Sequence, residues 1–318
     1  MIRVFYLQKN GGFTWSKRPE KIIPGDCDKM IWVDMQGSDD QERKLIEKTF
    51  QIELFTPQEA AEIESSSRYF EDESSIEANN TFIVYENKTY VQEQISIILK
   101  KDILFTIRDA DVKSFAETVR KLRAIKNSQS VKATQILLTL LETQIDLDAD
   151  FIEYISKLTS SVSKVLIKEK VYTEDVLLNI TELQENTILA RESIVDKQRL
   201  LSALLKSAFI SSDEKDRLRI IFKDVNSILQ HAEFNFERLE YLQNTFLGLV
   251  NIQQNTVIKI FTVVTVVFMP PTLIASIYGM NFDIMPELNW TLGYPFVIVL
   301  MLISSLGFLW YFKRKKWL

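Results

Sequence analysis

Two long apolar segments near the end of this chain constrain its fold more than any other feature. Residues 260–278 and 295–312 contain no charged side chain. Each approaches the ~20 residues that a helix needs to cross about 30 Å of hydrocarbon. We therefore expect two transmembrane helices, at about 259–279 and 295–312, with the rest of the chain outside the bilayer.

Basic residues flank these two segments on one side only. Lys259 precedes the first segment, whereas the connection 279–294 has no Lys or Arg and contains Asp283 and Glu287. Lys and Arg close to membrane helices are retained in the cytoplasm. We therefore expect a multi-pass protein of the cell membrane (inner or plasma membrane) with both termini cytoplasmic. A basic cluster after the second segment agrees with this orientation: Lys313, Arg314, Lys315 and Lys316.

The composition indicates a large water-soluble part beside this small membrane part. Charged residues make up 25% of the chain, and its mean hydropathy is close to zero. The net charge is −5 although the flanks of the membrane segments are basic, so residues 1–258 are acidic. Nucleic acid requires a basic surface, and we expect no such partner. An acidic surface suits cations, but ordinary solvated charges explain it equally well.

The pattern of residues divides the chain into four regions. We expect a cytosolic α/β domain over 1–130, a mixed sheet with flanking helices, and a cytosolic helical region over 131–212 that packs with it. A long stalk helix over 213–258 then leads into a two-span α-helical membrane domain over 259–318. Runs of β-branched and aromatic residues predict strands, and apolar periodicity predicts helices. The predicted strands are 4–7, 30–35, 81–85, 90–99 and 103–108, and the predicted helices include 39–50, 57–64, 131–172 and 173–209.

The third long helix is unusual in its length. From Asp213 to Met269 there is no proline and one glycine, Gly248. Apolar residues recur along this segment at steps of three and four, which is typical of one buried helical face. A continuous helix of this length extends about 85 Å and connects the cytosol with the membrane. Two helices broken near Gly248 are the alternative.

Polar and apolar side chains share one face of the first membrane segment. Two helices cannot enclose an aqueous path, so a conducting protein requires a ring of copies. The alternative is that each Thr or Ser only donates to a carbonyl of its own helix. The second segment has Ser304 and Ser305 as its small polar side chains, and we expect it to face lipid. The predicted pore-lining residues are Asn255, Ile258, Phe261, Thr262, Thr265, Met269, Thr272 and Ser276.

The end of the first segment carries a recognisable motif. Tyr278-Gly279-Met280-Asn281-Phe282 is followed by Met285-Pro286-Glu287-Leu288, by Trp290 and by Gly293-Tyr294-Pro295. This series resembles the signature of the CorA-type divalent cation transporters, which carry magnesium and often cobalt. The resemblance is strong over 255–318. Further upstream it rests only on the order of the regions, an acidic α/β domain followed by a long helix.

The resemblance implies a homopentamer in the lipid bilayer whose first membrane helices line a pore. Gly279, Met280 and Asn281 would form the selectivity filter, with Asn281 contributing one amide oxygen per subunit. Magnesium releases its water reluctantly, so neutral acceptors suit the hydrated ion. Ile258, Phe261 and Met269 would form apolar constrictions.

The resemblance also implies passive magnesium influx that is gated by intracellular magnesium. Magnesium would then be both the substrate and a regulatory ligand. Glu62 and Asp224 lie roughly where regulatory carboxylates would be expected, and Asp283 and Glu287 would attract cations to the outer mouth. Plain surface charge is the alternative interpretation for all four.

Other functions fit the sequence less well. His231 and Cys27 are the only residues of their kinds, so no Cys–His pair or zinc cluster is suggested, and we expect no enzyme. No phosphate-binding loop appears, and we expect no organic cofactor. Zinc, nickel or cobalt as the main substrate is the alternative within transport. A membrane-anchored structural or signalling coiled-coil protein is the alternative from another class.

Overall fold

The computed structural model describes residues 1–7, 13–16, 30–55, 68–124, 131–281 and 285–315. These residues form two compact units, Met1–Leu242 and Gln243–Leu318, which are described separately. The helix expected at 57–64 lies outside the described residues.

The first unit is built on a seven-stranded sheet with the order β2-β1-β3-β7-β6-β5-β4. β3 and β7 are parallel, and the other pairs of described strands are antiparallel. All five predicted strands are confirmed, and β2 and β4 are additional edge strands. The bounds are β1 Ile2–Leu7, β2 Phe13–Ser16, β3 Met30–Gln36, β4 Tyr69–Glu71, β5 Ser75–Glu86, β6 Thr89–Lys100 and β7 Ile103–Arg108.

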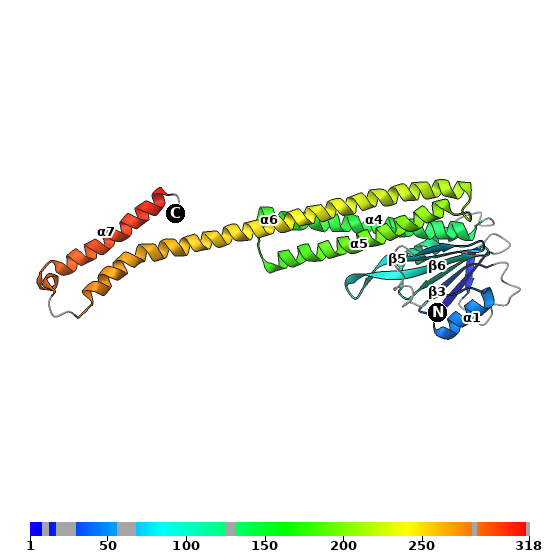
Figure 1. Cartoon of the computed structure of the whole chain (residues 1–318), viewed down its shortest axis with the longest axis horizontal. Coiled ribbons are helices and arrows are strands. Elements are labelled where there is room, and N and C mark those ends of the chain that lie inside the picture. Colours follow the sequence, from blue (N-terminus) through cyan, green and yellow to red (C-terminus); the bar gives the residue numbers. More distant parts are fainter. Residues whose placement is uncertain (8–12, 17–29, 56–67, 125–130, 282–284, 316–318) are drawn as a thin grey trace. The chain divides into compact units, whose positions relative to one another are not determined.

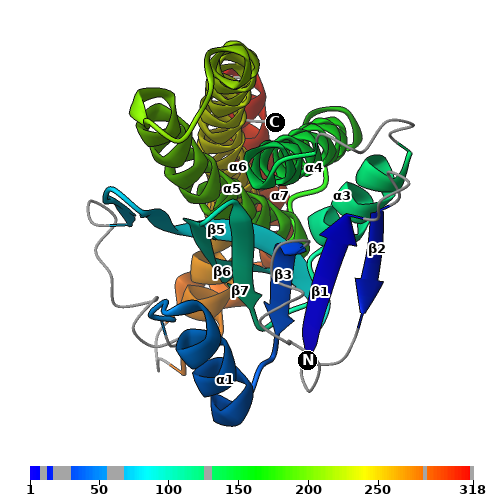
Figure 2. The same cartoon turned by 90° about the vertical axis from the view of Figure 1, so that its right-hand side faces the viewer.

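Helices cover both faces of this sheet (Figure 2). On one face lies α1 (Asp40–Phe50), which begins with a capping box between Asp39 and Glu42. Its Ile46 is fully buried among apolar side chains of β1, β3 and β7. Alternate residues of each strand point to this face because the side-chain period of a strand is two.

The opposite face is covered by α3 (Lys113–Arg123), α4 (Ala133–Lys164) and α5 (Glu174–Lys206). Charged groups are buried here beside aromatic ones. The Arg108 guanidinium donates to both carboxylate oxygens of Asp34, from Nε at 3.1 Å and from Nη2 at 2.9 Å. It also lies over the Phe115 ring, 4.2 Å from the centroid. Pairing of this kind satisfies charges that would be costly to bury alone.

The boundary between α4 and α5 differs from the expectation. Helix α4 ends at Lys164, and one π-helical turn, Val165–Glu169, follows it. Lys170 then takes the left-handed conformation at φ 54°, which reverses the chain. Thr173 occupies the N-cap position of α5, but its side chain makes no capping hydrogen bond.

Helix α6 (Ser212–Tyr278) is continuous over 67 residues (Figure 1). Its first turn is closed by Glu214, whose Oε2 accepts hydrogen bonds from the backbone N and from Oγ of Ser211, at 3.0 and 2.7 Å. The helix passes through Gly248 without a break, so the alternative of two helices is wrong. Seven of the apolar residues that recur along this helix at steps of three and four are buried: Leu218, Ile221, Val225, Ala232, Leu239, Leu242 and Phe246.

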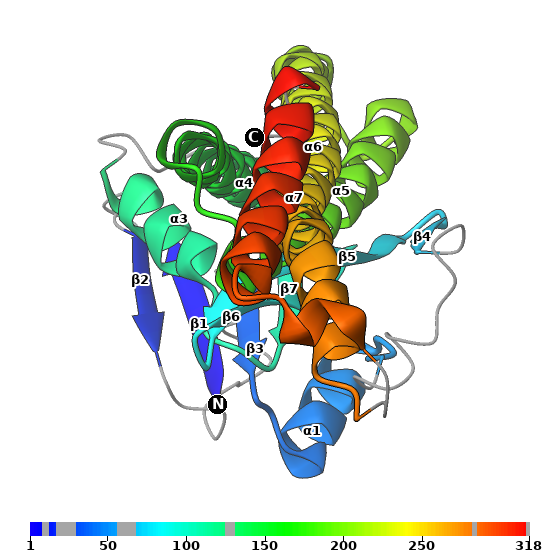
Figure 3. The same ribbon diagram turned by 90° about the vertical axis from the view of Figure 1, so that its left-hand side faces the viewer.

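The second unit contains the end of α6 and α7 (Gly293–Arg314), joined by residues that include the short helix Pro286–Asn289. Both α6 and α7 contain a stretch long and apolar enough to cross a membrane. They lie side by side (Figure 3), with Phe312 of α7 packed on Val263 and Val267 of α6. An α/β domain, a very long helix and a pair of apolar helices confirm the predicted fold class.

Candidate functional site

The eight predicted pore-lining residues lie on one exposed face of α6. At 3.6 residues per turn they span an arc of about 120°. The large side chains Phe261 and Met269 are 68% and 60% exposed. Apolar surface of this extent is characteristic of an interface or of a membrane environment.

Helix α7 packs on the other side of α6. Val263 and Val267, which Phe312 covers, lie away from the polar face around the α6 axis. The chain therefore does not cover the face of α6 that carries the eight predicted pore-lining residues, which we call the stripe. The stripe remains accessible to an aqueous path or to other copies of the chain.

Each threonine of the stripe donates to a carbonyl one turn earlier. The Oγ1 atoms of Thr262, Thr265 and Thr272 lie 2.8, 2.9 and 2.8 Å from the carbonyl oxygens of residues 258, 261 and 268. The hydroxyl protons of these threonines are therefore bonded within their own helix, as the alternative interpretation stated. The hydroxyl oxygens retain free lone pairs, so the stripe presents hydrogen-bond acceptors, which suit the water molecules around a cation.

The helix ends where the Gly-Met-Asn motif begins. Gly279 N donates to the Ala275 carbonyl at 2.9 Å, and Met280 N donates to the Ile277 carbonyl at 3.3 Å. A Cβ atom on Gly279 would lie 3.1 Å from the Ala275 oxygen, which is a tight contact. Asn281 follows directly and is exposed. The carboxamide thus stands at the C-terminal end of α6, where the helix dipole is negative and favours cations.

The remaining predicted residues are only partly described. Asp283, Lys316 and Glu62 lie outside the described residues, and Glu287 lies in the helix Pro286–Asn289. Asp224 is exposed on α6. Lys313 and Arg314 form the last turn of α7, which Lys315 caps, and the Arg314 guanidinium lies 5.5 Å from the centroid of the Trp310 ring.

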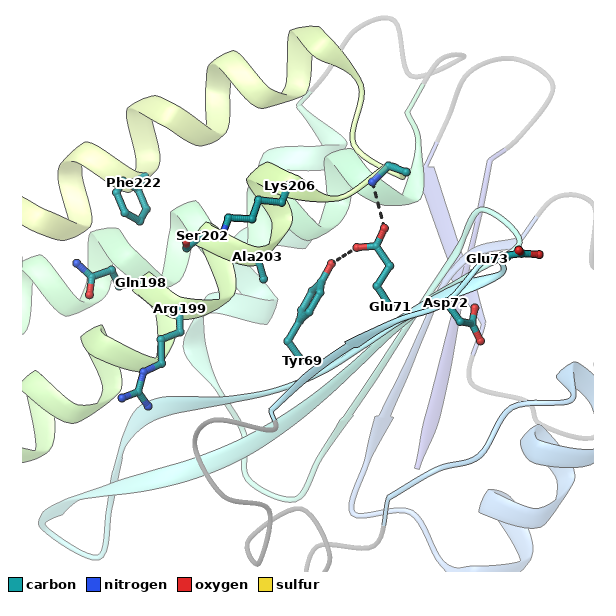
Figure 4. A pocket seen from close by; sticks show the side chains of 11 residues that line it. Tyr69, Glu71, Asp72, Glu73, Gln198, Arg199, Ser202, Ala203, Lys206 and Phe222 are labelled. Carbon is teal, nitrogen blue, oxygen red and sulfur yellow. Dashed lines mark hydrogen bonds between the residues drawn. The ribbon is translucent and has the colours of Figure 1, made fainter.

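A cavity of about 1000 Å³ in the first unit was not expected from the sequence (Figure 4). Tyr69, Glu71 and Asp72 line it from the β4 side, and Arg199 and Lys206 line it from α5. The sequence did not predict that these carboxylates line a cavity, because they become neighbours of α5 only when the sheet forms.

The carboxylates of Glu71 and Asp72 accept hydrogen bonds from other groups of the same chain. Glu71 accepts from the Tyr69 hydroxyl at 2.5 Å and from Ala208 N at 3.1 Å. Burial and this hydrogen bond raise the pKa of Tyr69 above its usual range. Asp72 Oδ1 accepts from the backbone N of Ser74 and of Ser75, at 2.6 and 2.7 Å, which lowers the Asp72 pKa. Among the described residues, no group of three or more His, Cys, Asp or Glu is placed to hold a metal ion.

Comparisons with known proteins point to one family. The family model described as "CorA-like Mg2+ transporter protein" matches residues 28–314. A magnesium transport protein CorA from Wolinella succinogenes is 40% identical over 301 residues, which cover 93% of each chain. The one from Salmonella typhimurium is 36% identical over 327 residues, which cover 100% of each chain.

The fold agrees with solved structures. The complete structure of the CorA magnesium transporter from Methanocaldococcus jannaschii matches with a TM-score of 0.82 at 20% identity, over 100% of this chain and 99% of that one. The full-length CmaX protein matches with a TM-score of 0.74 at 14% identity, over 100% and 98%.

Proposed function

The chain belongs to the CorA-like Mg²⁺ transporter family, and from this premise we propose that it forms a passive channel for magnesium influx. The observation that carries this proposal is the exposed stripe of acceptors on α6, together with Asn281 just beyond the end of that helix. A membrane-anchored coiled-coil protein would have a long helix too, but no need for such a stripe.

The channel is a homopentamer in the lipid bilayer, as the family resemblance implies. One chain supplies two membrane helices, so a closed path requires several copies. The α6 stripes face the common axis, and α7 lies on the outer side, which agrees with its place on Val263 and Val267.

The selectivity filter consists of Gly279, Met280 and Asn281. Each Asn281 carboxamide accepts a hydrogen bond from water in the first shell of the ion, so the ion does not have to shed that shell. The Met280 thioether is too soft a ligand for Mg²⁺ and serves in packing. The negative helix end beneath Asn281 adds to the attraction of the cation.

The stripe below the filter both conducts the ion and closes the pore. Thr262, Thr265, Thr272, Ser276 and Asn255 present oxygen acceptors to the hydrated ion along the axis. Rings of the apolar side chains Ile258, Phe261 and Met269 alternate with them, and a narrow apolar ring closes a pore when it loses its water.

The membrane potential drives the flow. An interior-negative potential of 100 mV contributes about 4.6 kcal/mol for a divalent ion, so no nucleotide is needed. Asp283 and Glu287 raise the cation concentration at the outer mouth. The basic residues 313–316 remain in the cytoplasm and orient α7.

Such a driving force requires regulation from the inside. Intracellular magnesium binds acidic groups of the cytosolic domain, with Glu62 and Asp224 as the proposed residues, and stabilises the closed pore. Hydrated cobalt resembles hydrated magnesium in size and charge and passes by the same route.

Ion flux through the purified full-length protein in liposomes tests this function. We expect magnesium-dependent flux that increases with an interior-negative potential and is inhibited by cobalt hexaammine, whose ligands do not exchange readily. Larger flux with zinc or nickel would assign a different main substrate. The absence of flux from correctly assembled protein would contradict the proposal and favour a structural role.

A further inference from the structure

Two adjacent prolines, Pro270 and Pro271, lie inside the membrane part of α6. Proline has no backbone N–H, so the carbonyl four residues earlier loses its helical partner. The two carbonyls affected are those of Val266 and Val267. Within hydrocarbon there is no water to replace the missing donor, and a neighbouring helix or a hydroxyl must do so.

Ser305 of α7 supplies a donor at this position. Its Oγ lies 3.3 Å from the carbonyl oxygen of Val267. The adjacent Ser304 instead donates to the carbonyl of Met301 in its own helix, at 2.7 Å. A serine in an apolar helix commonly bonds within that helix, so the direction taken by Ser305 is informative. It is turned toward α6, whereas the sequence predicted that the second segment faces lipid.

The bonded carbonyl belongs to the segment that carries the proposed constriction. Val267 is two residues before Met269, and its side chain is buried against α7. The same short segment contains Thr265 and Thr272, whose side chains face the proposed path. A change in the backbone at Val267 therefore changes the placement of these pore-facing groups.

We propose that Ser305 is a positioning residue whose hydroxyl replaces the N–H that Pro271 lacks. Through this bond α7 holds the proline segment of α6 in one conformation and sets the position of Met269. The inference rests on the proposed function only in that α6 lines the ion path. The hydrogen bond itself is a property of the fold.

Two substitutions of equal shape isolate the hydroxyl. Ser305→Thr keeps it, whereas Ser305→Val replaces it with a methyl group. In full-length protein in liposomes, we expect Ser305→Val to change the maximal magnesium flux by about threefold, the size of effect typical of one hydrogen bond between membrane helices. The magnesium concentration at half-maximal flux should stay unchanged, because Asn281 is untouched. Ser305→Thr and the control Ser304→Ala should match the wild type, and equal effects of Ser305→Thr and Ser305→Val would overturn the proposal.

The prolines allow a second test that does not depend on transport. Without other changes, Ser305→Val should lower the unfolding temperature of the detergent-solubilised protein. Pro271→Ala restores the N–H that bonds the Val267 carbonyl, so in that background Ser305→Val should not lower the unfolding temperature. Pro270→Ala restores a partner for the Val266 carbonyl only, and in that background Ser305→Val should lower the unfolding temperature as much as it does in the wild type. An equal drop in both backgrounds would overturn the assignment of the Val267 carbonyl. If the wild type conducts no ion, the proposed function fails, while this temperature comparison still decides the bond.

Discussion

The Nζ atom of Lys197 lies 3.0 Å from Oδ2 of Asp148, and the two side chains are 0% and 1% exposed. Nζ also donates to the Thr81 carbonyl at 2.8 Å and to Ser193 Oγ at 2.6 Å. Asp148 accepts a further hydrogen bond from Gln144 at 2.9 Å. The pair therefore connects α5 with α4, and Lys197 also connects α5 with strand β5.

Removing one member of this pair should destabilise the protein strongly. Lys197→Met leaves a buried carboxylate without its cation, and we expect a loss of about 3–5 kcal/mol in the free energy of unfolding. The double variant Lys197→Met/Asp148→Leu should recover most of this loss, because apolar groups of similar volume replace both charges. Urea unfolding followed by tryptophan fluorescence, to which buried Trp32 contributes, measures the free energy of unfolding of both variants. A double variant as unstable as the single one would contradict this account.

The same pair predicts a pH dependence. Burial raises the pKa of Asp148, so the folded state binds a proton at this site more readily than the unfolded state does. An acid with a raised pKa destabilises the fold above that pKa, and the effect disappears as the pH falls below it. The difference in the free energy of unfolding between Lys197→Met and Lys197→Met/Asp148→Leu should therefore narrow as the pH is lowered through the raised pKa of Asp148. A gap that is constant or widens on acidification would show that Asp148 is not the titrating group.

Asn281→Ala should lower magnesium flux by about tenfold or more, because each subunit loses an acceptor for the water around a charged ion. Asn289→Ala is the matched control, since Asn289 is also exposed and lies in the same connection between α6 and α7. Flux into liposomes at saturating magnesium compares the two variants. Flux of Asn281→Ala at the normal rate would remove Asn281 from the filter.

Gly279→Ala should disturb the end of α6. The added Cβ would lie 3.1 Å from the Ala275 carbonyl oxygen, so the backbone that presents Asn281 must shift, and we expect a severalfold loss of flux. Gly248→Ala is the control in the same helix, because a Cβ there meets no atom within 4 Å. That change should preserve flux and stabilise the helix by about 0.5–1 kcal/mol. Equal flux from both variants would contradict a steric role for Gly279.

Neutralising the proposed regulatory carboxylates should weaken inhibition by internal magnesium. With Glu62→Gln and Asp224→Asn combined, we expect flux to continue at internal magnesium concentrations that close the wild-type channel. Glu240→Gln, also exposed on α6, should retain normal closure. Patch recordings with controlled internal magnesium give the comparison, and normal closure in the double variant would place the sensor elsewhere.

Local signals in the sequence predicted the long helices and the inner strands well. The five predicted strands have enough β-branched and aromatic residues to be recognised singly. The edge strands β2 and β4 were missed because they have four and three residues. Such short segments become strands only because β1 and β5 offer them hydrogen-bonding partners.

The sequence by itself determined the two apolar helices and the end of α6 close to Gly279, whereas the structure decided that α6 is continuous through Gly248. The features that the sequence determined depend on composition and on the spacing of neighbouring residues, which act within a few helical turns. Only the tertiary structure decided that Lys197 meets Asp148, that Glu71 meets Ala208, and that Ser305 faces Val267 and not lipid. The members of each pair are far apart in the chain, so no local pattern specifies them. Packing brings them together, and the need to satisfy buried polar groups then selects the contact.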